Sequence, residues 1–199
     1  MTGRRRGSRT PAALLAAAGL VLPGPLPGQA RAKPPAEVAD EYLRGIEAMA
    51  WRATAQRIHP DALAEVRDLI EIFLAPEVDR DGAFLEALSG GQDGETFLSL
   101  DDGSLFVSAM RALTREAPGI VNAMTARRTE VIGTVTEADT LTHAVYRLHW
   151  ELSGAEPEMK VLSLARDSRG RWRVREAPEL ASLRPAIRAL GRRVRPPPP

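Results

Sequence analysis

The sequence predicts an α+β domain in which two to three N-terminal helices pack on a curved antiparallel sheet. Apolar residues recur every three or four positions in the first half of the chain, which is typical of helices that bury one face. In the second half they alternate with polar residues, which is typical of strands in a half-buried sheet. Helices followed by sequential strands favour one mixed domain over a parallel α/β fold.

The first 32 residues have the composition of an export leader. An arginine-rich stretch (residues 3–9) precedes about twelve mostly apolar residues (11–22), and the segment ends at Ala30-Arg31-Ala32, a small-x-small cleavage pattern. The sequence therefore predicts a secretory signal peptide at 1–32, with no membrane span after its removal; a disordered N-terminal arm is the alternative. Because the chain has no cysteine, we expect export to a bacterial periplasm or to the exterior, without disulfides.

The charge balance argues against nucleic acid as a partner. Five of the 27 basic residues lie in the leader, which leaves 22 against 26 acids and a formal charge of −4. The basic excess of the whole chain therefore belongs to the segment expected to be removed.

Three helices are predicted before the sheet, at residues 36–53, at 60–75 with Pro60 in the first helical position, and up to Ala117 after a cap at Asp102 or Ser104. The glycine-rich stretch between Asp79 and Asp102 is predicted to be a loop that holds one short strand or turn.

Four strands are expected to follow as an antiparallel meander, at residues 129–137, 141–152, 158–166 and 171–176. The domain is predicted to span residues 33–177. The remainder, 178–199, is expected to hold a short helix interrupted by Pro185 and a disordered proline-rich tail.

The order of these elements, together with the turn Asp167-Ser-Arg-Gly-Arg-Trp172 before the last strand, resembles the NTF2-like superfamily of cone-shaped α+β domains, and in particular its exported bacterial members. The stretches that carry the resemblance are residues 51–63, 130–135, 143–147 and 161–166. The resemblance implies a sheet curled around helices, often with a ligand pocket at the open end, and frequent homodimers. Its isomerase-type members use a pocket carboxylate with tyrosine or acid donors. Here Tyr42 and Tyr146 are present, but no motif assigns the acid.

His59 and Asp61 are the local candidates for catalysis, because a histidine beside a carboxylate can act as an oriented base. The alternative is that they cap a helix at a corner. If the domain has a pocket, the aromatic residues and this histidine are expected to line it (Trp51, His59, Tyr146, Trp150 and Trp172). The alternative for the aromatic residues is a place in the core.

A basic surface patch for an anionic partner is possible on adjacent strands (His143, Arg147, Arg171, Arg173 and Arg175). The alternative is a solvated sheet face balanced by Glu130, Glu137 and Glu151. His143 and His149 lie six residues apart, roughly 20 Å along a strand, so they cannot share one ion. No metal site and no cofactor are predicted.

These observations favour an exported, non-catalytic domain that binds a small apolar ligand or a protein partner. An isomerase- or cyclase-type enzyme that uses His59 or Asp61 is one alternative. A self-associating structural module, such as a homodimer, is the other.

Overall fold

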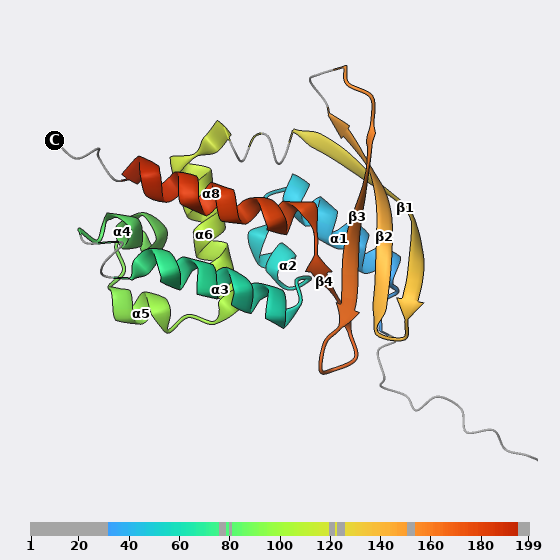
Figure 1. Cartoon of the computed structure of the whole chain (residues 1–199), viewed down its shortest axis with the longest axis horizontal. Helices are drawn as coiled ribbons and strands as arrows, with labels where there is room; N and C mark the ends of the chain where they lie inside the picture. The colour runs from blue at the N-terminus through green and yellow to red at the C-terminus, as the bar shows by residue number, and fades with distance from the viewer. Residues whose placement is uncertain are drawn as a thin grey trace, which may run out of the picture. The chain divides into compact units, whose positions relative to one another are not determined.

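The computed structural model describes residues 32–75, 79, 81–119, 122, 126–150 and 154–194, without the side chains of 191–194. It confirms the α+β class: helices cover one face of an antiparallel sheet, as Figure 1 shows. The predicted leader, apart from Ala32, and the proline-rich end lie outside the described residues. None of the described helices is long and apolar enough to cross a membrane.

The first predicted helix is two helices. The chain forms α1 (Pro35–Glu47), turns at Met49, and continues as α2 (Trp51–Ala55). Met49 has a left-handed backbone (φ 52°) and an exposed side chain, although the helical pattern placed it on the buried face. The turn lets Trp51 fold back into the core, and this long-range packing outweighs the local periodicity.

The second and third predicted helices are confirmed as α3 (Pro60–Leu74) and α6 (Asp102–Glu116). The N-cap of α6 is Asp101 and not Asp102 or Ser104, the two residues predicted. Its Oδ1 accepts a hydrogen bond from the Ser104 backbone N–H at 3.0 Å.

The prediction of a loop with one short strand or turn between Asp79 and Asp102 was wrong. The structure has two short helices there, α4 (Ala83–Ser89) and α5 (Gly94–Leu98). The Asp79 carboxylate accepts hydrogen bonds from the backbone N–H groups of Phe84 and Leu85 in the first turn of α4, and Asp93 caps α5 through the N–H of Thr96. Phe97, in the short apolar run of this stretch, is buried on α5.

The sheet has the predicted sequential order, β1-β2-β3-β4, with every neighbouring pair antiparallel. Its strands are β1 (Arg127–Ala138), β2 (Leu141–Trp150), β3 (Glu158–Arg166) and β4 (Trp172–Glu176). Alternation along β2 is confirmed, since Ala144, Tyr146 and Leu148 are buried against the helices. Leu152, predicted to continue this face, lies outside the described residues. The outer edge of β4 pairs with the segment before α3, where the His59 N–H donates to the Val174 carbonyl at 2.8 Å.

The predicted short C-terminal helix is a 17-residue helix, α8 (Pro178–Val194), which continues through Pro185. A proline inside a helix costs about 3 kcal/mol. Four side chains of α8 are buried in the core and together offset that cost: Leu183, Ala186, Ile187 and Leu190.

Candidate functional site

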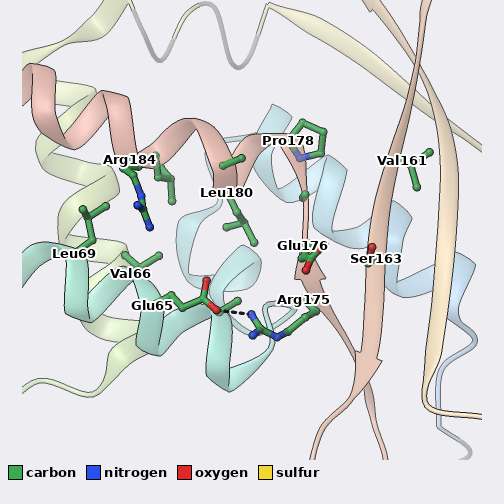
Figure 2. Close-up of a pocket in the computed structure, with 14 residues that line it drawn as sticks. Glu65, Val66, Leu69, Val161, Ser163, Arg175, Glu176, Pro178, Leu180 and Arg184 are labelled. Carbon is green, nitrogen blue, oxygen red and sulfur yellow. Dashed lines mark hydrogen bonds and ion pairs between the residues drawn. The ribbon is translucent and has the colours of Figure 1, made fainter.

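A groove lies between α3, the β3–β4 side of the sheet and the first two turns of α8, and we call it the α3–α8 groove (Figure 2). Its volume is about 450 Å³, within the range of small-molecule sites. It is lined by residues 62, 65, 66 and 69 of α3, by Val161 and Ser163 of β3, and by residues 175–178, 180, 181, 183 and 184.

Apolar side chains form most of the wall. Val66 and Leu69 come from α3, and Leu180 and Leu183 come from α8. The periodicity of each helix thus supplies one wall, because residues three or four apart share a helix face. Val66 and Leu183 belong to the buried core, so this wall is held by the packing of the domain.

Charged groups occur at the rim of the groove. Arg175 Nη1 lies 2.9 Å from Glu65 Oε1, the contact dashed in Figure 2, and Arg175 Nε lies 3.9 Å from Asp61 Oδ2. Glu176 and Arg184 also line the groove and are exposed. No ion pair joins either of them to another residue that the structure describes.

On the other side of α8 lies a buried polar cluster formed by Tyr42, Arg127, Tyr146 and Glu179. The Tyr146 hydroxyl donates a hydrogen bond to Glu179 Oε1 at 2.9 Å. Arg127 Nη2 lies 2.9 Å from the same oxygen, but its orientation does not make a hydrogen bond. The Tyr42 hydroxyl and Glu179 Oε2 have no hydrogen-bond partner in the described part of the chain.

Burial dominates the electrostatics of the cluster. Loss of solvation raises the pKa of Tyr42 and of Tyr146 far above the ordinary value, and the neighbouring Glu179 carboxylate raises both further. Both phenols are therefore neutral at physiological pH. The cavity beside Tyr42 and Glu179 measures about 10 Å³, which is room for one water molecule at most. Leu180 and Leu183 line both this cavity and the α3–α8 groove, so they stand between the two.

None of the five residues predicted to line a pocket faces the α3–α8 groove. Trp51, His59, Tyr146 and Trp172 are buried. The Arg166 guanidinium lies 4.4 Å from the centre of the Trp172 ring, and the Trp150 indole N–H donates to Glu158 at 2.9 Å. Trp51 also borders a shallow depression beside Met49 and Arg52 and touches the small cavity near Glu179.

His59 and Asp61 occupy the corner before α3. His59 is the N-cap of α3, and its Nδ1 accepts a hydrogen bond from the Asp61 backbone N–H at 3.3 Å. The Asp61 side chain is exposed, with Oδ2 3.5 Å from the His59 Nδ1. The structure thus gives this pair the capping geometry that was the alternative to catalysis.

The residues of the predicted basic patch do not lie on adjacent strands, because β3 separates β2 from β4. On β2, His143 pairs with Glu137 at 2.7 Å and Arg147 with Glu130 at 3.0 Å. Beside β4, Arg171 and Arg173 both pair with Asp167, and Arg175 pairs with Glu65. Each cation of the predicted patch is therefore paired with an acid, although Arg171 and Arg173 share Asp167, as the solvated-face alternative expects.

The sequence did not indicate Glu179, Arg127 or Arg184. Glu179 follows Pro178 at the start of a segment interpreted as a tail, where an acid is the ordinary complement of a helix N-terminus. The signal that was available was the apolar spacing of Leu183, Ile187 and Leu190 (four and three residues), which predicts a helix packed on the core. No group of three potential metal ligands gathers among the described residues.

Comparison of the chain with family models, with curated proteins and with solved structures found no match. We therefore base a functional proposal on the geometry of the groove and on the chemistry of the side chains that line it.

Proposed function

We propose that the protein is an exported, non-catalytic binding domain whose α3–α8 groove takes a small, mainly apolar ligand. The observation that carries the proposal is a groove of about 450 Å³ whose walls are side chains of α3 and α8. Sites of this size bury most of a small molecule, and apolar walls with a few polar groups at the rim are their usual lining. Export and the likeness to the NTF2-like superfamily remain predictions from the sequence.

A small molecule fits this groove better than a folded protein partner. Stable protein–protein interfaces bury about 800 Å² on each partner, and the groove is confined to two turns of α8 and the facing parts of α3, β3 and β4. The enzymatic alternative that uses His59 or Asp61 gains no support from the geometry, because neither residue lines the groove and His59 caps α3.

The test is competitive binding with a neutral, environment-sensitive dye such as Nile red. We expect saturable binding to the purified protein, and displacement by a neutral medium-chain alcohol such as decanol. Ala181→Trp should weaken binding by at least about tenfold, because Ala181 is an exposed residue of the groove wall and an indole there fills the space.

Ala138→Trp is the matched control, because Ala138 is exposed at the end of β1, away from the groove. It should bind the dye as the unaltered protein does. Absence of saturable binding, or an equal loss in both variants, would contradict the proposal.

A further inference from the structure

Of the two arginines that line the α3–α8 groove, Arg184 is the one without an acidic partner among the described residues. It lies on α8, is exposed, and lines the groove. In Figure 2 its side chain extends from α8 toward α3, where Val66 and Leu69 form the opposite wall. No carboxylate within the described residues lies within 4.0 Å of its guanidinium, whereas Arg175 is paired with Glu65.

The charges of the groove are therefore unequal along its length. The contact with Glu65 neutralises Arg175, so Arg184 and Glu176 remain as the cation and the anion of the groove that pair with no described residue. In Figure 2 Leu180 lies between these two residues. An apolar segment thus separates a positive end at Arg184 from a negative end at Glu176.

We propose that the groove selects amphiphilic carboxylates and that Arg184 binds the carboxylate. The inference rests on the proposed function and adds the ligand class and its orientation. The planar guanidinium presents two parallel N–H donors that match the two oxygens of a carboxylate. The alkyl chain of such a ligand lies along Val66, Leu180 and Leu183, where burial of its methylene groups supplies the apolar part of the affinity. Repulsion by Glu176 disfavours the reversed orientation.

The experiment compares three probes by displacement of Nile red from the purified protein at pH 7 and low ionic strength. The probes are decanoate, decanol and decyltrimethylammonium, each below its micelle-forming concentration. We expect decanoate to bind about three- to tenfold more tightly than decanol, because the additional interaction is a charge-assisted hydrogen bond at a partly exposed site. Decyltrimethylammonium should be the weakest, and 0.5 M salt should reduce the preference for decanoate.

Arg184→Gln keeps part of the aliphatic stem but removes the charge. It should abolish the preference for decanoate and leave the affinity for decanol unchanged. Arg188→Gln is the matched control, because Arg188 is an exposed arginine one turn further along α8 that does not line the groove. It should keep the preference.

Equal affinities of the unaltered protein for decanoate and decanol would overturn the carboxylate inference and leave the proposed function intact. Loss of the preference in Arg188→Gln to the same degree as in Arg184→Gln would also overturn it, because the effect would then reflect the net charge of α8. If neither decanoate nor decanol displaces the dye, the proposed function itself fails.

Discussion

At the scale of single residues, Asp167 carries the polar contacts of the β3–β4 turn. Its Oδ1 accepts hydrogen bonds from the N–H groups of Arg169 and Arg171, both at 2.9 Å, and its Oδ2 lies 3.3 Å from Arg173 Nε. Burial by itself raises the pKa of this carboxyl, but the N–H and guanidinium donors outweigh burial and hold the pKa well below its usual range. This turn, which ends at Trp172, is part of the sequence resemblance to the NTF2-like superfamily. The part that Asp167 plays in it follows from the four N–H donors, two of the backbone and two of guanidinium groups, that converge on one carboxylate.

We expect Asp167→Asn to lower the free energy of unfolding by about 1–3 kcal/mol at pH 7, because it removes the charge from a set of buried hydrogen bonds. A depressed folded pKa contributes stability that is full above the unfolded value near 3.9 and is lost as the pH falls toward the folded value. The difference between the two proteins should therefore be constant above about pH 5 and shrink below pH 4. Urea unfolding at pH 7, 4 and 2.5 measures it. A difference that stays the same at all three values would contradict the assignment.

Tyr42 and Tyr146 form a matched pair, since both are fully buried in the same cluster but only Tyr146 donates to Glu179. Tyr146→Phe should cost about 1–2 kcal/mol, because the buried carboxylate loses a donor. Tyr42→Phe should stay within about 0.5 kcal/mol of the unaltered protein, because the hydroxyl that it removes has no partner to lose. Urea unfolding of both variants provides the comparison, and equal costs would show that the hydrogen bond to Glu179 contributes nothing.

At the scale of elements, the periodicity of apolar residues predicts the helices and strands correctly, except where tertiary packing overrides the local pattern. The alternation along β2 and the apolar face of α3 are local patterns, and both are confirmed. The break between α1 and α2 is not local, since it depends on a close approach between Gly45 and Thr54 that no spacing rule reveals. The helices α4 and α5 were missed because glycines at their ends resemble loop signals, although Asp79 and Asp93 supply the hydrogen bonds that start them.

The packing of α1 on α2 yields a direct test. A Cβ atom at Gly45 would lie 2.5 Å from Thr54 Oγ1, closer than two atoms can pack. Gly45→Ala should therefore destabilise the protein by about 1–3 kcal/mol, despite the better helix propensity of alanine. Adding Thr54→Ala removes the clashing oxygen and should make Gly45→Ala much less costly than it is in the unaltered background.

Gly133→Ala is the control for this test, because Gly133 has open space around its Cα and no positive φ. It should be close to neutral in thermal unfolding. If Gly45→Ala costs as much in the Thr54→Ala background as alone, the contact between the two residues does not determine where α1 ends.

At the scale of the whole molecule, the α3–α8 groove could not be predicted from the sequence. It joins α3 to β3, β4 and α8, segments separated by about a hundred residues, and their adjacency depends on how the sheet edge closes against α3. The residue types predicted for a pocket were aromatic, but Trp51, Tyr146 and Trp172 are buried in the core, and the groove is lined by aliphatic residues. The fold class could be predicted because apolar residues recur with a different period in the helices and in the strands. The groove could not be predicted, because it lies where the helices meet the sheet.

The folded unit ends at α8, beyond the predicted domain end. The sequence places the end of the domain at residue 177, but α8 buries Leu183, Ile187 and Leu190 in the core shared with α6 and the sheet. It also supplies Glu179, the acid beside the buried Arg127. Removing α8 exposes that core and leaves Arg127 without its counter-charge, a loss comparable to the whole stability of a domain, about 5–15 kcal/mol.

We therefore predict that a chain ending at Ala177 shows no cooperative thermal transition by circular dichroism, whereas a chain ending at Val194 melts like the full chain. Ile187→Ala in the full chain refines the test, because it should cost about 2–5 kcal/mol if α8 is packed as described. A cooperative transition in the chain that ends at Ala177, near the temperature of the full chain, would mean that α8 covers a core complete without it. The α3–α8 groove would then have one wall that detaches without unfolding the domain.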